Sequence, residues 1–107
     1  MTSQELFLAL LHRLQRYTDA MVLHAMLRQQ ADVSEFKGSA SHISLDLLGG
    51  LVHMKQVQRS LIRLGEMGLL QCRTHANYKT HVSVDRAAVK ALLRTPVSPY
   101  VPGVIED

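Results

Sequence analysis

The stretch that decides the fold is ISLDLLGGLVHMKQVQRSLIRLGEMGLL, residues 43–70, whose pattern predicts a helix, a turn and a second helix. In the second helix, residues 54–66, Val57, Leu61 and Leu64 lie at i, i+4 and i+7, which makes one apolar stripe facing a core. The rest of its surface is mostly basic or amide-bearing, with Lys55, Gln56, Gln58, Arg59, Ser60, Arg63 and Glu66. Such side chains suit base edges and phosphates in a major groove, so this helix is a candidate recognition helix.

The residues around this helix mark its ends and those of the helix before it. The preceding helix is predicted at residues 45–51, with Ser44 as its N-cap and, because a capped helix start presents N–H groups, as a candidate phosphate contact. Gly49 and Gly50 weaken that helix by about 0.5–1 kcal/mol each and favour close packing or an early turn. Gly68 is placed to end the recognition helix, and His53 to cap its start and touch phosphate.

Beyond residue 69 the apolar period changes from helical to alternating, which predicts a β-hairpin. Leu70, Cys72 and Thr74 share one face of the first strand, and a turn at residues 76–79 leads into a second strand at 80–84. Cys72 is expected to be a small buried hydrophobe. Asp85 then caps a last helix that ends before Pro96, with an apolar face of Ala88, Val89, Leu92 and Leu93.

The N-terminal part predicts two more helices. Thr2 and Glu5 have capping-box spacing, so a helix should begin there and end near residue 17, and Thr18 and Asp19 are placed to cap a second helix reaching about residue 30. Residues 32–41 are polar and predict a surface loop, followed by a short edge strand at residues 42–43. The first helix is apolar over more than half its circumference, which favours a dimer contact through Leu6, Phe7, Leu10, Leu11 and Leu14, although packing across its own domain is the alternative.

Length and composition limit the class of protein. The 107 residues, 47% of them hydrophobic but only 5% aromatic, predict one domain at residues 1–94, mainly α with a small β-hairpin, followed by a tail at 95–107 that holds all three prolines. The single cysteine excludes an internal disulfide. Charges and histidines interrupt the apolar positions of the first thirty residues, so neither a signal peptide nor a membrane span is expected, and the cytoplasm is the simplest location.

Positive charge is concentrated in the second half of the chain. Residues 53–94 carry eight basic residues against two acidic ones, whereas residues 1–52 carry four against five. Clustering of this kind beside a recognition-like helix is expected of a polyanion binder, with a merely solvated face as the alternative.

On the segment VHMKQVQRSLIRLGEMGLL, with its E-x-G-L-[IL] continuation into a hairpin, the chain resembles winged helix-turn-helix DNA-binding proteins of bacterial, plasmid and phage regulators. The resemblance covers about residues 18–94 and adds an N-terminal helix to that fold. It implies a recognition helix in the major groove and a wing on the adjacent minor groove or backbone. Carried over, the base-facing residues are Lys55, Gln56 and Arg59, Arg63 lies on phosphate, and the wing contacts are Arg73, Asn77, Tyr78 and Lys79.

The expected function is therefore a dimeric, cytoplasmic, sequence-specific regulator of transcription, more in keeping with a repressor that occludes its operator. A centromere-binding or replication-control protein of a plasmid or phage is an alternative within the same class, and a winged helix used for protein contacts is an alternative from another. The six histidines suggest metal sensing but lack ligand spacing, so we expect no metal and no cofactor. No enzymatic motif is present, and we expect no catalysis.

Overall fold

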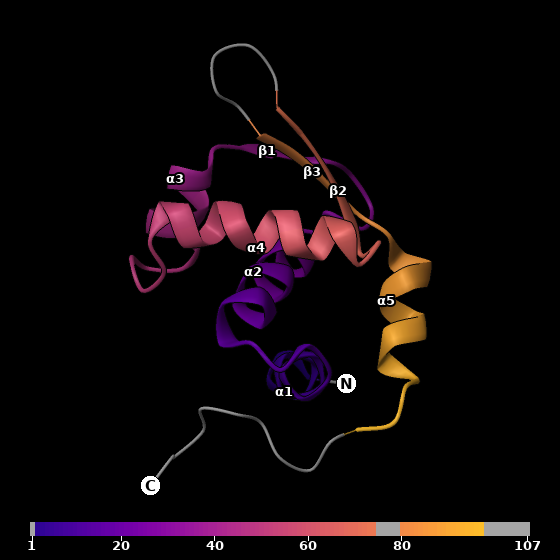
Figure 1. Cartoon of the computed structure of the whole chain (residues 1–107). Helices are drawn as coiled ribbons and strands as arrows, with labels where there is room; N and C mark the ends of the chain where they lie inside the picture. Colours follow the sequence, from indigo (N-terminus) through magenta and orange to yellow (C-terminus); the bar gives the residue numbers. More distant parts are fainter. Residues whose placement is uncertain (1, 75–79, 98–107) are drawn as a thin grey trace, which may run out of the picture.

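The computed structural model of the chain describes residues 2–74 and 80–97. Over these ranges the protein is mainly helical, with one small antiparallel sheet (Figure 1). Along the chain the elements are α1 (Ser3–Leu14), α2 (Tyr17–Arg28), β1 (Phe36–Gly38), α3 (Ala40–His42), the π-helix η1 (Ile43–Leu47), α4 (Met54–Glu66), β2 (Leu70–Thr74), β3 (Thr80–Val84) and α5 (Arg86–Leu93). The predicted combination of helices with a small amount of β structure is confirmed.

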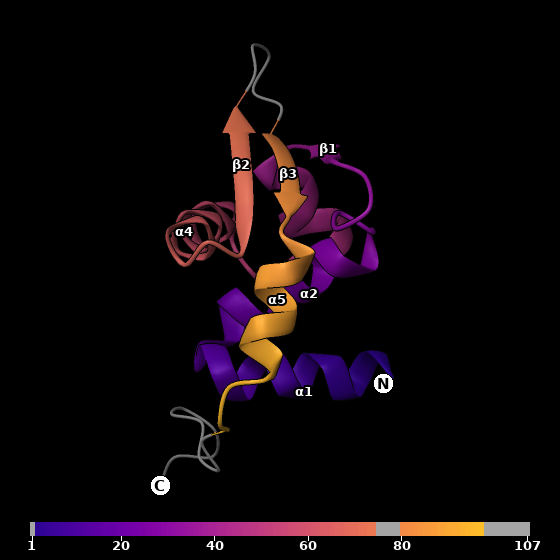
Figure 2. The same cartoon turned by 90° about the vertical axis from the view of Figure 1, so that its right-hand side faces the viewer.

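The core lies where α2 packs against α4 and the sheet closes over them. Helix α2 contacts both α1 and α4, and α5 returns along the side of the molecule to reach α1 (Figures 1 and 2). The predicted apolar stripe of α4 is confirmed, since Val57, Leu61 and Leu64 are all buried. Around them lie Leu23, Met26, Ile43 and Val82, which have no exposed surface. Helix α4 is thus fixed along its whole length by one face.

Helix α1 begins as predicted but ends early. The Thr2 hydroxyl accepts a hydrogen bond from the Glu5 N–H at 3.1 Å, which confirms the cap. The helix ends at Leu14 rather than near residue 17, because Gln15 takes a φ of 61°. Tyr17 therefore starts α2, where Arg16 occupies the N-cap position without a side-chain hydrogen bond. The predicted capping of α2 by Thr18 and Asp19 is wrong.

The predicted dimer surface on α1 is largely used inside the domain. Leu10 is completely buried, and Leu11 and Leu14 are only 5% and 9% exposed, because α1 packs against α2 and α5 in the same chain. Leu6 and Phe7 are partly buried against the same core. The structure thus assigns Leu10, Leu11 and Leu14 to packing across their own domain. Helix α1 contacts α2 and is also crossed by α5, so two helices of the same chain cover its wide apolar surface (Figure 2).

The sheet has one strand more than the predicted hairpin. Strands β2 and β3 pair antiparallel as expected, with Leu70 opposite Val84, and Val82 and Val84 face the core. The additional strand β1 lies inside the segment predicted to be a loop and pairs with the other edge of β3, giving the order β1-β3-β2. A three-residue strand of Phe, Lys and Gly carries no alternation long enough to be recognised in a sequence.

The segment between β1 and α4 is helical earlier than predicted. Ser39 caps α3 by accepting a hydrogen bond from the His42 N–H at 3.0 Å, so the chain is already helical at His42 and the predicted edge strand at residues 42–43 is wrong. The helical path ends at Leu47 instead of running to residue 51, because Gly49 and Gly50 take φ values of 60° and 76°. The two glycines form the turn into α4.

The predicted ends of α4 and α5 are confirmed. Gly68 follows α4 with a φ of 77°, and its N–H bonds to the Gly65 carbonyl while the Leu69 N–H bonds to the Leu64 carbonyl, which is a Schellman ending. Asp85 caps α5 by accepting from the Ala88 N–H at 3.0 Å. Helix α5 ends at Leu93 before Pro96, and the predicted tail lies outside the described residues from position 98.

Candidate nucleic-acid interface

The start of α4 is held by a reciprocal cap. His53 is the N-cap residue, and its Nδ1 accepts a hydrogen bond from the Lys55 N–H at 3.1 Å, while the Gln56 side-chain oxygen accepts from the His53 N–H at 3.3 Å. The capping role predicted for His53 is confirmed. Because the oxygen of Gln56 is occupied in this cap, its NH2 group is the part of that amide left for a base edge.

The outward face of α4 presents Lys55, Gln58 and Arg59, which are all exposed. Within residues 2–74 and 80–97, no side-chain hydrogen bond or ion pair engages any of the three. Their spacing at i, i+3 and i+4 places them on one side of the helix, opposite the buried Val57 and Leu64. Two cations and an amide therefore project together from a helix whose opposite side is locked in the core.

Arg63, predicted to contact phosphate, is instead paired inside the domain. Its Nη2 lies 2.7 Å from Asp19 Oδ1 and its Nε lies 3.0 Å from Asp19 Oδ2, so the guanidinium grips the carboxylate at two points. The Ser60 hydroxyl donates to the same carboxylate at 2.7 Å, and both Asp19 and Ser60 are buried. The hydrogen bonds that the Arg63 guanidinium donates to Asp19 raise the pKa of Arg63. This cluster of Asp19, Ser60 and Arg63, called here the α2–α4 lock, fastens the two helices together.

Ser44 is also removed from the predicted interface. It lies within η1, is 4% exposed, and its hydroxyl donates to the Val52 carbonyl in the turn before α4. Because helix formation begins at α3, Ser44 caps no helix start and cannot meet a phosphate. Its hydrogen bond instead closes the glycine turn that leads into α4.

Arg73 on β2 belongs to a polar cluster with Glu35 and His81. Arg73 Nη2 lies 2.7 Å from Glu35 Oε2, and His81 Nδ1 lies 3.1 Å from Glu35 Oε1. The Arg73 hydrogen bond holds the pKa of Glu35 below its ordinary value, and Glu35 in turn raises the pKa of Arg73. The Arg73 side chain keeps 66% of its surface exposed, so it can still reach an anion. The other predicted wing residues, Asn77, Tyr78 and Lys79, lie outside the described residues.

A groove of about 770 Å³ runs along one side of α4. Met54, Gln58 and Ile62 line it from α4, and Cys72 and Thr80 line it from the sheet. Cys72 is exposed there, so the prediction of a buried cysteine is wrong; Leu70, two residues earlier on the same face of β2, is buried in the core, whereas Cys72 borders the groove. Partial desolvation raises the pKa of the Cys72 thiol, which disfavours the reactive thiolate.

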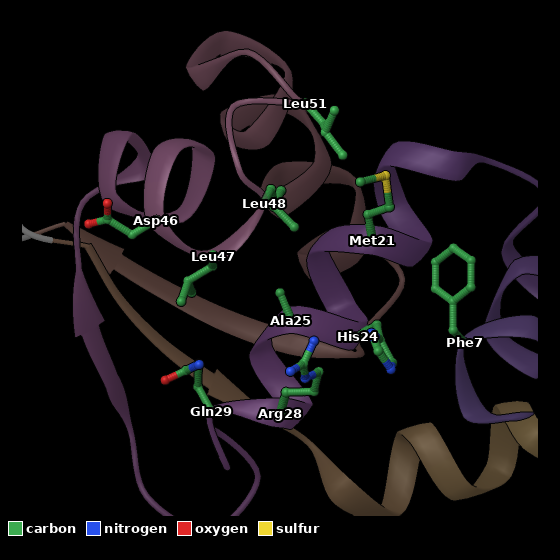
Figure 3. A pocket seen from close by; sticks show the side chains of 10 residues that line it. All are labelled: Phe7, Met21, His24, Ala25, Arg28, Gln29, Asp46, Leu47, Leu48 and Leu51. Atoms are coloured by element: carbon green, nitrogen blue, oxygen red, sulfur yellow. The ribbon is translucent and has the colours of Figure 1, made fainter. Parts of the chain in front are cut away.

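A second hollow of about 570 Å³ lies between α1, α2 and η1 and involves no residue of α4. Figure 3 shows Met21 and Leu51 on one side of it and His24 and Arg28 on another. His24 is held by Ser3, whose hydroxyl lies 2.9 Å from its Nε2, and packs edge-on against Phe7. Burial lowers the pKa of His24, which favours a neutral ring. This hollow is lined by both apolar and polar side chains, with Arg28 and Asp46 as its charged residues, and it is set apart from the face of α4 that carries the basic side chains.

Two kinds of feature are absent from residues 2–74 and 80–97: a cluster of metal ligands and a helix able to span a membrane. There, no three His, Cys, Asp or Glu side chains are grouped closely enough to hold a metal ion. The helices described are all too short or too polar to cross a lipid bilayer.

Comparisons with models of protein families, with curated proteins and with solved structures find no match to this chain.

Proposed function

We propose that this protein is a winged helix-turn-helix protein that binds double-stranded DNA by placing α4 in the major groove. The observation that carries the proposal is the outward face of α4, where Lys55, Gln58 and Arg59 are exposed and unengaged within the described residues while the opposite face is buried. Burial of one side of α4 holds the helix in place, and the other side presents cationic and amide side chains to solvent. Contacts with bases and phosphates require side chains of these kinds.

The order of elements supports the same proposal. Helix α2, the short strand β1, the helical segment α3–η1, helix α4 and the strands β2 and β3 follow one another, with a sheet order of β1-β3-β2. In a winged helix, such a β2–β3 pair carries the wing beside the recognition helix. Arg73 lies on β2, and residues 77–79, which include a tyrosine and a lysine, connect β2 to β3, so these residues are the proposed wing contacts.

The proposed role is regulation of transcription, as a repressor that excludes other proteins from its site. A dimer on a two-fold symmetric site would double the contacts of a single small domain. Since Leu10, Leu11 and Leu14 are buried in their own domain, such a dimer needs another surface. Sedimentation at micromolar concentration tests dimerisation, and a monomer with full DNA affinity would exclude it. A partition or replication role on a plasmid or phage would use the same DNA contacts.

The experiment that tests DNA binding is selection of bound fragments from random and genomic DNA, followed by affinity measurements over a salt series. Lys55→Ala and Arg59→Ala should each weaken binding, and loss of a phosphate contact should reduce the slope of log K against log salt by about 1. Lys90→Ala is the matched control, since it removes an exposed cation from α5 instead of α4. Equal effects of all three substitutions, or no enriched sequence, would contradict the proposal.

A second candidate, a winged helix that binds protein, is favoured by exposed apolar residues near α4. Leu51 is 81% exposed, Leu45 is 63% exposed and Ile62 is 61% exposed. A protein-binding domain predicts weak DNA binding that neither Lys55→Ala nor Arg59→Ala alters. The same salt series therefore separates the two candidates.

A further inference from the structure

Ile62 is a large apolar residue that lies on the surface of α4 and contributes little to the core. It lies in the third turn of α4 with 61% of its surface exposed, whereas the core contacts of this helix come from Val57, Leu61 and Leu64. An exposed β-branched residue also forms helix less readily than the alanine or glutamine that a purely solvated face would carry. Neither packing nor helix stability accounts for Ile62.

The neighbours of Ile62 identify the kind of surface that it shares. It follows Arg59 by three residues, Gln58 by four and Lys55 by seven, so these four side chains project from one side of α4. Both charged members of this group are cations, and the one carboxylate on the same side of α4, Glu66, is the last residue of the helix; the first three turns of this face are therefore complementary to a polyanion. The occupant that suits an apolar side chain among cations and an amide is therefore a nucleic acid groove, in preference to an apolar protein surface.

The major groove offers one apolar group on the base edges, the C5-methyl of thymine. We infer that Ile62 determines sequence specificity by packing against a thymine methyl in the DNA site; this inference rests on the function proposed above. Gln58, one helical turn earlier, has the donor and acceptor that match adenine N6 and N7. Together the two residues select neighbouring A·T pairs, and the groove beside Gln58 and Ile62 leaves room for the methyl group.

The test uses the full chain and the DNA sequence obtained by selection. Each thymine of that sequence is replaced in turn by deoxyuridine, which removes only the C5-methyl group. At one or two positions the wild-type protein should bind about fourfold more weakly, since a buried methyl-sized group contributes about 0.8 kcal/mol. Ile62→Ala should show no loss at those same positions. Val33→Ala, which shortens an apolar side chain 73% exposed in the segment before β1, should retain the wild-type response.

The outcomes distinguish failure of the proposed DNA binding from failure of the role proposed for Ile62. If no sequence is enriched, the proposed DNA binding itself fails. If a sequence is enriched but the deoxyuridine effects are equal in wild type and Ile62→Ala, DNA binding stands and the role of Ile62 is refuted. If Ile62→Ala changes the sedimentation of the protein and leaves base preference unaltered, Ile62 belongs to a protein contact, which also refutes the inference.

Discussion

The α2–α4 lock leads to the most specific prediction about stability. Arg63→Ala would leave the Asp19 carboxylate 2% exposed with only the Ser60 hydroxyl as a hydrogen-bond partner, and an uncompensated buried charge costs about 3–5 kcal/mol. Asp19→Ala should cost less, about 2–3 kcal/mol, because the Arg63 side chain keeps 32% of its surface exposed and its guanidinium can turn toward water. The order of the two effects follows from this difference in exposure.

Urea unfolding followed by circular dichroism measures both variants. With a slope of about 1 kcal/mol per molar urea for a small domain, the midpoints should fall by about 3–5 M for Arg63→Ala and about 2–3 M for Asp19→Ala, where the domain remains folded. The double variant should be more stable than the sum of the single losses predicts, because it contains no unpaired charge. An Arg63→Ala protein with wild-type stability and a reduced salt slope for DNA binding would show that Arg63 contacts phosphate and would refute the lock.

Three further effects follow from local geometry. Gly68→Ala should lower the free energy of unfolding by about 1 kcal/mol because of the positive φ of 77°, whereas Gly65→Ala, inside α4 with its nearest neighbour at an ordinary 3.8 Å, should raise it by about 0.5–1 kcal/mol; equal signs in urea unfolding would contradict this. Asp85→Ala should lower the thermal midpoint through loss of about 1 kcal/mol of capping, and an unchanged midpoint would show that the cap contributes nothing. The lowered pKa of Glu35 stabilises the fold above its ordinary pKa of 4.5, and this contribution is lost as pH falls through the lowered value; Glu35→Gln should therefore reduce the loss of stability between about pH 6 and pH 3, and an identical pH profile would exclude the contribution.

The elements that a sequence predicts well here are those with a local physical cause. The stripe of Val57, Leu61 and Leu64, the caps at Thr2 and Asp85, and the stop at Gly68 each depend on residues within one or two turns of one another. All were predicted correctly. Strand β1 was missed because it forms by pairing with β3, which leaves no periodic signal in its own three residues. The helix start at Ala40 was missed because its cap, Ser39, lies in a serine-rich segment where no one serine stands out.

The residues of the candidate interface show the same difference between local and long-range causes. Exposure of Lys55, Gln58 and Arg59 follows from the helical period alone, and the structure reproduces it. The fate of Arg63 depends on Asp19, which lies 44 residues away in the chain, and no local pattern distinguishes an arginine that faces solvent from one that meets a buried carboxylate. Ser44 was misplaced for a similar reason, since its partner is a backbone carbonyl across the glycine turn.

The lock and the outward face of α4 are linked by helix geometry. If α4 turned about its own axis by the angle of one residue, about 100°, exposed side chains would move toward the core and buried ones toward solvent. Ser60 and Arg63 would then no longer reach Asp19 to donate their hydrogen bonds. The bidentate grip on a carboxylate buried in α2 therefore fixes the rotation of α4, and with it the direction in which Lys55, Arg59 and Ile62 point. A polar anchor serves this purpose better than further apolar contacts, because leucine and valine side chains tolerate repacking whereas a buried charge does not tolerate the loss of its partner. If α4 binds DNA as proposed, substitution of Arg63 should consequently impair base preference through α4 orientation, measured by selection of bound fragments under conditions where circular dichroism shows a folded domain; an unaltered preference would contradict this role of the lock.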